Sequence, residues 1–416
     1  MPAQCRQPRA MTTEQFIQEH LHDDVRYLAL QRAKYPDVDL PFALDQIRGW
    51  QTARQKLPSW AATKGVIYPP HLSMEQCSSE ATAVYKASIA KRLSRPLGNE
   101  TPHGALVDLT GGFGVDFAFM KKALQGVVSQ FVYVERQETL CSIAKQNFQR
   151  LGLDNAEVLC ADGMEYLHAM PPASLVFIDP ARRDTHGART FAIADCTPDV
   201  LSIERELLQK ADHAILKLSP MLDISATVEA LGREKVREVH VVSVANECKE
   251  LLVVLSERGI NTHYYCVNDG NVLTFASSMP LRERGFVDEA PPALGVGGHL
   301  YLYEPNASIM KMGCFGILCQ HYGVKALGAN SHLFVSQDNM EDFPGRSFQV
   351  RAITSMNKKE LRRHLQGITR ANITTRNFPL SASDLRKRLA LRDGGDTYIF
   401  ATTNHRGEHI LLICGK

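Results

Sequence analysis

Long hydrophobic runs are missing from this sequence, and none approaches the roughly 20 apolar residues that a membrane-spanning helix needs. Residues 1–10 also lack the apolar centre of a secretory signal peptide. We therefore expect a cytoplasmic protein with no membrane partner. Hydrophobic residues make up 44% of the 416 positions and charged residues 22%, a composition that excludes a largely disordered protein. At roughly 100–200 residues per domain, the length allows two to four domains.

Paired cysteines are absent as well. The ten cysteines are scattered, with no CxxC pair and no Cys/His spacing of the kind that holds zinc. We expect them to be reduced and mostly buried thiols, and we expect no metal.

An excess of charge of one sign is missing from the sequence as a whole, where the net charge is +2. Residues 345–416 nevertheless contain 14 lysines and arginines against 5 acids, so this segment carries +9 and the remainder −7. An anionic partner such as a nucleic acid is therefore expected to bind there.

Residues 1–103 are predicted to form a helical domain. Segments 13–31 and 43–55 space apolar and polar residues as helices do, with almost no strand-like alternation. A capping box from Ser73 to Gln76 predicts a helix over 74–93, followed by a linker rich in proline, glycine and polar residues.

Residues 104–284 alternate short apolar runs with amphipathic helices, which predicts an α/β domain with a parallel sheet covered on both faces. A helix over 199–210 would be capped by Thr197, with Pro198 at its first position. Strands 236–244 and 250–257 are five residues apart, too close for a parallel crossover, so they predict a final antiparallel hairpin. The other strands are expected at 105–110, 131–136, 156–162, 174–180 and 213–220, and the other helices near 115–124, 138–151, 163–169 and 224–231.

Two α+β modules are predicted to follow. The first, 285–344, has the pattern of a small ferredoxin-like module, with a helix over 307–323 between two strands. The second, 345–416, is the basic segment. It alternates strands with helices capped by Asn357 and by a box from Ser381 to Asp384, and it ends in a hairpin.

The turn from the first strand to the first helix, 107–116, is rich in glycine, which lets backbone amides approach a ligand closely, although tight packing alone is an alternative. A dinucleotide fingerprint starting at Gly112 would need a small residue where Phe117 stands, which disfavours a nicotinamide dehydrogenase. Glu135 ends the second strand and suits two ribose hydroxyls. Asp162 ends the third and could accept from an adenine amino group. Each acid alone could be a solvated surface residue, but together they predict a nucleoside site at one sheet edge.

Residues 105–256 resemble a class I S-adenosylmethionine-dependent methyltransferase. Thr110 replaces the first glycine of that family's GxGxG loop, and Asp179 with Pro180 matches the start of its catalytic motif. The resemblance implies S-adenosylmethionine as cofactor, held by Asp108, Thr110, Gly112, Gly114, Asp116, Glu135, Asp162 and Gly163.

The sequence DPAR at 179–182 bears on the reaction. It lacks the second proline and the aromatic of nucleobase nitrogen methyltransferases, and it is more like the motif of RNA uridine C5-methyltransferases. Leu218 stands where the latter enzymes have their nucleophilic cysteine, so covalent uracil methylation is not expected. We expect Asp179, Pro180 and Arg182 to be catalytic, with direct in-line transfer to nitrogen. Substrate contacts are expected from Arg183, Phe191 and Lys217, with the base stacked by Arg182, by Phe191 or by neither.

Two further segments are expected near the site. The segment 184–198 is expected to shape the substrate entrance. The segment 76–80 would either cap the methionine end of the cofactor or form a plain helix surface.

The basic segment resembles the THUMP-like module of a bacterial family assigned to RNA methyltransferases, and the four-part layout resembles that family. Arg362 and Arg386 belong to a set of cations suited to phosphates, although a solvated surface is an alternative. We therefore expect methylation of a base nitrogen in tRNA or rRNA. The alternatives are a protein or small-molecule methyltransferase and an inactive RNA-binding protein of the same fold.

Overall fold

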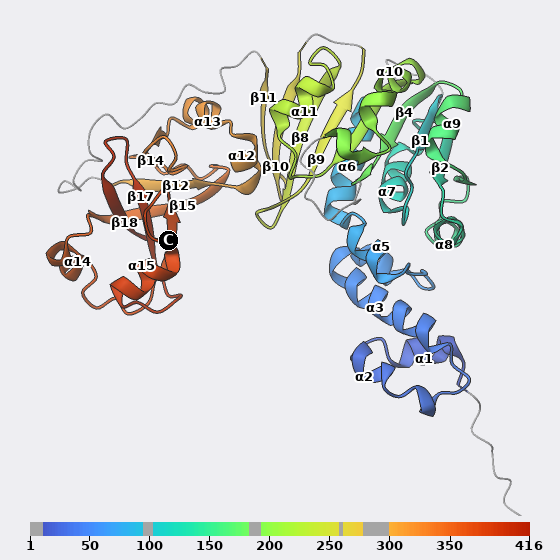
Figure 1. Ribbon diagram of the computed structural model, residues 1–416, viewed down its shortest axis with the longest axis horizontal. Coiled ribbons are helices and arrows are strands. Elements are labelled where there is room, and N and C mark those ends of the chain that lie inside the picture. The colour runs from blue at the N-terminus through green and yellow to red at the C-terminus, as the bar shows by residue number, and fades with distance from the viewer. Residues whose placement is uncertain (1–10, 95–102, 183–192, 258–260, 278–298) are drawn as a thin grey trace, which may run out of the picture. The chain divides into compact units, whose positions relative to one another are not determined.

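The computed structural model describes residues 11–94, 103–182, 193–257, 261–277 and 299–416 (Figure 1). These residues belong to two compact units, which are considered separately. The first unit consists of 1–237 and 251–260, and the second of 238–250 and 261–416. Among the described residues, no helix has the length and apolar character needed to cross a membrane.

The first unit begins with helices, as predicted. The expected capping box at Ser73 is wrong, because α5 ends at Gln76 and α6 begins after Ser79, whose hydroxyl accepts from the Thr82 amide at 3.3 Å. The chain is extended at Cys77, which separates the two helices. The helices are α1 (Thr13–Glu19), α2 (Val25–Ala29), η1 (Arg32–Lys34), α3 (Leu40–Lys56), α4 (Pro58–Ala62), α5 (His71–Gln76) and α6 (Glu80–Leu93).

The sheet of the first unit has the strand order β9-β7-β4-β1-β2-β3. Its strands are parallel except for β9, which runs antiparallel to β7. The strands are β1 (Ala105–Asp108), β2 (Gln130–Glu135), β3 (Glu157–Cys160), β4 (Ala173–Ile178), β7 (Ala211–Leu218) and β9 (Glu247–Leu255). The helices between them are α7 (Val115–Leu124), α8 (Glu138–Arg150), α9 (Gly163–Ala169), α10 (Val200–Lys210) and α11 (Ile224–Ala230). The prediction of an α/β fold with a parallel sheet is confirmed.

The predicted cap of α10 is wrong. Asp199 is the N-cap, and its carboxylate accepts from the Leu201 amide at 3.1 Å. Thr197 instead lies in a short strand, β6 (Cys196–Thr197), which pairs with β5 (Ala181–Arg182). The backbone of Thr197 is used in this pairing, so the helix starts two residues later than the Thr-Pro pattern suggested.

The second unit contains the predicted hairpin tip. Strand β8 (Val236–Val244) turns into β9 at Ala245 and Asn246, whose φ angles of 50° and 60° fit a two-residue hairpin turn. A second hairpin was missed by the sequence analysis. Its strands are β10 (His263–Asn268) and β11 (Asn271–Ala276), and β10 runs parallel to β8.

One seven-stranded sheet contains strands from both predicted C-terminal modules, in the order β13-β14-β12-β15-β18-β17-β16. The helix expected over 307–323 is two helices, because the chain takes a left-handed turn at Gly313 (φ 70°). The strands are β12 (Tyr301–Pro305), β13 (Lys325–Ala326), β14 (Phe334–Ser336), β15 (Gly345–Thr354), β16 (Asn372–Arg376), β17 (Thr397–Thr403) and β18 (His409–Gly415). The helices are α12 (Ala307–Met312), α13 (Phe315–Tyr322), α14 (Lys358–His364) and α15 (Ala382–Leu389).

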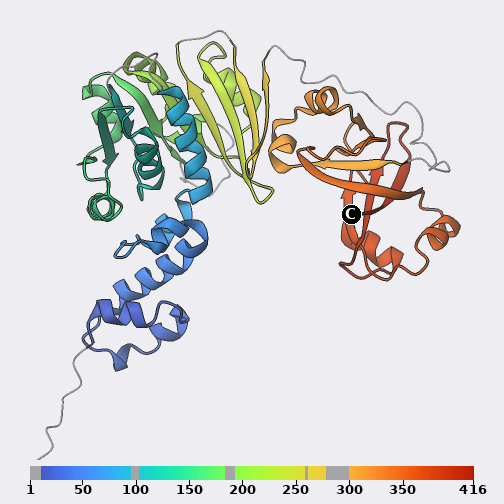
Figure 2. The same cartoon turned by 180° about the vertical axis from the view of Figure 1, so that it is seen from behind.

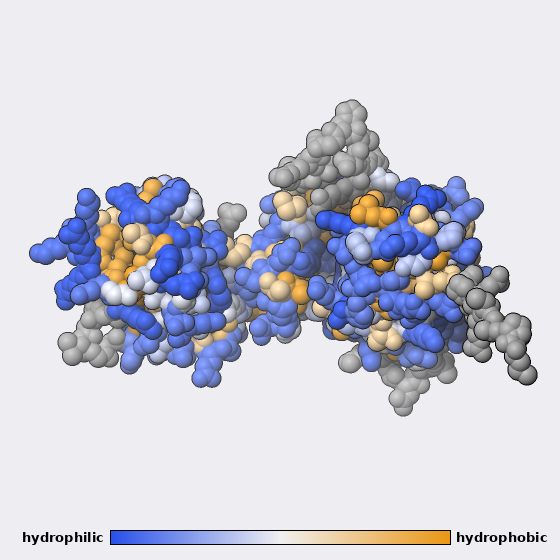
Figure 3. Space-filling model, turned by 90° about the horizontal axis from the view of Figure 1, so that it is seen from below, coloured by the Kyte–Doolittle hydropathy of each residue, from blue (hydrophilic) through white to orange (hydrophobic). Residues whose placement is uncertain are grey.

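Strand β18 shows how this sheet buries both faces. Leu412 and Cys414 belong to one apolar cluster, and the alternate residues Leu411 and Ile413 belong to another. Leu385 of α15 packs into the second cluster, so the helix covers that face. Hydrophilic side chains cover most of the surface visible in Figure 3.

The helical region is fastened to the α/β core of the first unit. Helix α6 packs against α7 (Figure 2). The ring of Trp60 lies 4.9 Å from that of Phe113, in the loop before α7. The fully buried side-chain amide of Asn147, on α8, bonds both the N–H and the carbonyl of Ile67 at 2.8 Å. The helices and the core therefore form one unit.

Replacing Asn147 with alanine leaves the two Ile67 backbone groups without their partner, which should lower the free energy of unfolding by about 2–4 kcal/mol. Urea denaturation measures the loss. The exposed neighbour Gln146→Ala is the matched control and should stay within about 0.5 kcal/mol of the wild type. Equal stability of Asn147→Ala and the control would show that this contact does not fasten the helices.

Candidate active site

The loop from β1 to α7 is held tightly against β2. A Cβ atom on Gly111 would lie 2.1 Å from the ring of the fully buried Tyr133, so only glycine fits there. Gly112 (φ 56°) and Gly114 (φ 83°) take left-handed conformations, and Gly114 is the N-cap of α7. Gly112 and Gly114 were predicted from the sequence but Gly111 was not, because the constraint on Gly111 comes from a side chain of the next strand.

Thr110, which departs from the glycine pattern, uses its side chain for a hydrogen bond to the backbone after β4. Its hydroxyl accepts from the Asp179 amide at 2.6 Å. This hydrogen bond joins the loop after β1 to the end of β4.

Glu135 meets the glycine-rich loop directly. One carboxylate oxygen accepts from the Gly112 amide and the other from the Gln137 amide, both at 2.9 Å, and the residue is 8% exposed. Each oxygen of an ionised carboxylate has two lone pairs, so Glu135 can accept further hydrogen bonds from a ligand.

Asp162 and Gly163 also come to this edge. Asp162 is the exposed N-cap of α9, and one of its oxygens accepts from the amides of Met164 and Glu165 at 2.8 and 3.2 Å. A Cβ on Gly163 would lie 2.1 Å from the carbonyl oxygen of Leu109, so this glycine lets α9 approach the end of β1.

Asp108 ends β1 and is 1% exposed. Burial raises the pKa of this carboxyl well above its usual range, and the carboxylates of Asp116, Asp179 and Glu135 act in the same direction. The Thr110 amide, which donates to Asp108 at 3.0 Å, opposes the shift without cancelling it. Asp108 therefore retains its proton to higher pH than an ordinary aspartic acid and can donate a hydrogen bond.

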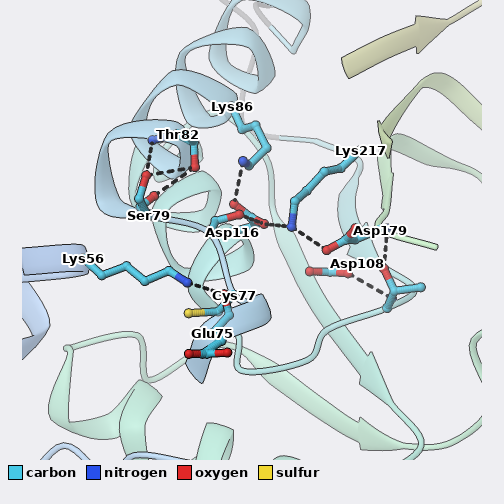
Figure 4. Close-up of polar contacts among 12 residues, drawn as sticks. Lys56, Glu75, Cys77, Ser79, Thr82, Lys86, Asp108, Asp116, Asp179 and Lys217 are labelled. Atoms are coloured by element: carbon cyan, nitrogen blue, oxygen red, sulfur yellow. Dashed lines mark hydrogen bonds and ion pairs between the residues drawn. The ribbon is translucent and has the colours of Figure 1, made fainter. Parts of the chain in front are cut away.

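Four alternating charges form what we call the charge row, Lys86, Asp116, Lys217 and Asp179 (Figure 4). Lys86 Nζ lies 3.2 Å from Asp116 Oδ1, Lys217 Nζ lies 3.7 Å from Asp116 Oδ2, and Lys217 Nζ lies 2.5 Å from Asp179 Oδ2. The row joins α6, α7, β7 and the end of β4.

Asp116 lies between the two lysines of the row. Burial alone would raise the pKa of its carboxyl, but the ammonium groups of Lys86 and Lys217 and the Ser78 hydroxyl, which donates at 2.7 Å, keep the pKa below the usual value. The site therefore contains one acid whose pKa is raised, Asp108, and one whose pKa is lowered, Asp116.

Lys86 and Ser78 were missed by the sequence analysis. Both lie in the helical region, far from the strands along the sequence. A signal for Lys86 does exist, because it shares the buried face of α6 with Ala83, Ile89 and Ala90. The segment 76–80, expected near the site, does approach it through Ser78.

Of the other predicted catalytic residues, Pro180 lies at this edge, buried directly after Asp179, whereas Arg182 is placed only by its backbone in β5. Arg183, Phe191 and most of the segment 184–198 lie outside the described residues. Arg362 is exposed on α14 of the second unit, and Arg386 on α15 forms an ion pair with Asp393 at 2.5 Å. Within the described ranges, no group of three or more His, Cys, Asp or Glu residues could hold a metal ion.

Comparison with known proteins identifies relatives of this chain. The crystal structure of a "putative methyltransferase" from Porphyromonas gingivalis W83 is 31% identical, with a TM-score of 0.81 over 96% of each chain. Family models described as a THUMP domain-like family and a ferredoxin-like domain match residues 345–416 and 301–344.

More distantly similar proteins match a smaller part of this chain. A protein-L-isoaspartate O-methyltransferase of Thermotoga maritima is 32% identical over 73 residues, which are 18% of this chain and 23% of that protein. The chain thus matches less than a quarter of that relative's length. An rRNA methylase structure from Streptococcus thermophilus has 15% identity and a TM-score of 0.31, covering 42% of this chain and 96% of the other. That likeness is too distant to bear on function.

The raised pKa of Asp108 predicts a pH-dependent effect of Asp108→Asn. The folded protein holds the proton more tightly than the unfolded one, so stability falls as pH rises above about 3.9, by up to about 1.4 kcal/mol per unit, until the folded-state pKa is passed. Asparagine does not titrate. The melting temperature of the variant relative to wild type should therefore rise as the pH is raised from about 4, as measured by calorimetry.

The exposed Asp154→Asn is the control for this prediction, because its carboxylate is solvated in both states. Its difference from wild type should stay flat over the same pH range. A flat difference for Asp108→Asn as well would mean that Asp108 ionises normally in the folded protein.

Proposed function

Because this chain belongs to the same family as the methyltransferase of Porphyromonas gingivalis, we propose that it transfers a methyl group from S-adenosylmethionine to a base nitrogen of tRNA or rRNA. The observation that carries the proposal is the meeting of the glycine-rich loop, Glu135 and Asp179 at the carboxyl edge of one parallel sheet. This edge is where open α/β sheets bind ligands.

The residues at this edge fit an S-adenosyl nucleoside. Only glycine fits at 111 and 163, and a side chain there would push the loop or α9 from its place. We assign Glu135 to the ribose hydroxyls, Asp162 to the adenine side, and Asp108, Thr110, Gly112 and Gly114 to the loop beneath the ligand. Asp116 differs from the sequence-based expectation, because its carboxylate accepts from the Ser78 hydroxyl and forms ion pairs with Lys86 and Lys217, and we assign it to the charge row. The bound cofactor would supply a methyl group activated on a sulfonium.

Asp179 is suited to orient the acceptor. Its carboxylate side chain is 37% exposed, against 13% for Lys217, so it is the end of the charge row most open to a substrate. Lys217 holds Oδ2, and the carboxylate can still accept from the N–H groups of a base amine. Orienting the amine next to the Pro180 carbonyl aligns its lone pair. Alignment is the main requirement of this transfer, since the leaving group is already good.

The second unit supports an RNA substrate. Exposed cations cluster on α14 (Lys358, Lys359, Arg362 and Arg363) and on α15 (Lys387 and Arg388). They lie in the segment matched by the THUMP domain-like family. The two helices pack against one apolar cluster through Leu361 and Leu385, and their exposed cations fit a phosphate backbone.

The role of Asp179 is tested by Asp179→Ala. Loss of the orienting carboxylate should lower kcat by about 100-fold, as misplacement of a reacting group does. The measurement is transfer of labelled methyl from S-adenosylmethionine to RNA from cells that lack the gene. Calorimetry with S-adenosylhomocysteine should give a Kd within about threefold of wild type.

The exposed Asp154→Ala is the matched control and should turn over like wild type. Undiminished turnover of Asp179→Ala would reject its orienting role. Labelling of protein or small molecules instead of RNA would reject the RNA substrate.

The basic surface is tested by replacing Lys358, Lys359, Arg362 and Arg363 with alanine. RNA affinity should fall, and the slope of log K against log salt should decrease by about 1 for each phosphate that the protein no longer neutralises. A control that removes four exposed cations of the first unit, Arg32, Lys64, Lys122 and Lys145, should leave the slope near that of wild type. Equal slopes for both variants would place RNA binding elsewhere.

A further inference from the structure

The helical region contributes a lysine whose burial needs an explanation. The Lys86 side chain is 0% exposed, and an ammonium group is costly to bury without an opposite charge. Its nitrogen lies 3.2 Å from Asp116 Oδ1, in the first turn of α7. The burial of Lys86 is therefore coupled to an acid that also lies 3.7 Å from Lys217, the ion-pair partner of Asp179.

Exposure rises along the charge row from Lys86 to Asp179. The side chains are 0%, 10%, 13% and 37% exposed in the order Lys86, Asp116, Lys217, Asp179. The row thus starts in the interior, at a residue that cannot touch a substrate, and ends at the partly exposed carboxylate assigned to the acceptor. We propose that Lys86 is a positioning residue of the active site, which acts through Asp116 and Lys217 on Asp179. This inference rests on the proposed function.

The physical basis is competition for Lys217. Its nitrogen lies 2.5 Å from Asp179 and 3.7 Å from Asp116, so the shorter contact is with Asp179. Asp116 tolerates the longer contact because the Lys86 ammonium already balances its charge and the Ser78 hydroxyl donates a hydrogen bond to it. Without Lys86, Asp116 would depend on Lys217 for an opposite charge, since an unpaired buried carboxylate is strongly unfavourable. Lys217 would then move toward Asp116, and Asp179 would lose its fixed orientation.

Both Lys86 and Ser78 come from the helical region, Lys86 from α6 (Figure 4) and Ser78 from the α5–α6 junction. The α/β core alone therefore does not complete the site. The competing interpretation is that Lys86 only fastens α6 to α7. If Lys86 positions Asp179, Lys86→Met lowers turnover more than another variant that loses the same stability. If Lys86 only fastens α6 to α7, the two variants lose turnover equally.

The experiment compares Lys86→Met, the double variant Lys86→Met with Asp116→Asn, and Asn147→Ala. Asn147→Ala weakens the attachment of the helical region at a different contact, which lies outside the charge row. Each is assayed for methyl transfer to RNA from cells that lack the gene, for S-adenosylhomocysteine affinity by calorimetry, and for melting temperature.

Lys86→Met should lower kcat at least tenfold with the Kd for S-adenosylhomocysteine within threefold of wild type. The double variant should recover most of the lost turnover, because a neutral residue at 116 no longer attracts Lys217. Asn147→Ala should lose melting temperature but keep kcat within about twofold. If Lys86→Met does not fold, the double variant tests the positioning role of Lys86, because it leaves no unpaired buried charge. A tenfold loss of kcat in the double variant would then overturn the proposal.

Wild-type turnover in Lys86→Met, or a loss no larger than that of Asn147→Ala, would overturn the inference while leaving the proposed function intact. Absence of methyl transfer to RNA by the wild-type protein would overturn the proposed function and this inference with it.

Discussion

The close contact between the glycine-rich loop and β2 is the constraint on which the candidate site depends. Gly111 lies so near the Tyr133 ring that a Cβ atom cannot be accommodated, and the Tyr133 hydroxyl donates to the carbonyl of Gly112. The Gly112 amide then reaches Glu135. With the loop fixed, α7 starts at Val115 and brings Asp116 to the charge row in its first turn. A shift of this loop would break the contact of Gly112 with Glu135 and that of Thr110 with Asp179, and it would displace Asp116.

The edge of the sheet concentrates five acids. Burial raises the pKa of Asp108. Glu135 and Asp162 each accept from two backbone amides. Asp116 and Asp179 are paired with lysines. Hydrogen bonds and ion pairs thus offset the repulsion among these side chains.

In the second unit, some of the lysines and arginines counted in the sequence are paired with acids, so the unpaired positive charge is smaller than the count suggests. Glu304 on β12 is 5% exposed and forms ion pairs with Arg346 and Arg376, and Asp393 pairs with Arg386. The exposed cations of α14 and α15 remain at the surface. The proposed RNA surface therefore rests on these helices, and the strand arginine Arg376 instead joins β16 to β12.

The sequence by itself determined the parallel sheet, the antiparallel β8–β9 hairpin, the glycine-rich turn and the acids after the first four strands, because spacing and turn residues act locally. Tertiary structure alone decided that one sheet unites the two C-terminal modules, that Asp199 rather than Thr197 caps α10, and that Asp116 belongs with Lys86. These outcomes depend on residues far apart in the sequence. No local sequence pattern predicts that Lys86 of α6 forms an ion pair with Asp116 in the first turn of α7, because only the folded chain places these two charges side by side.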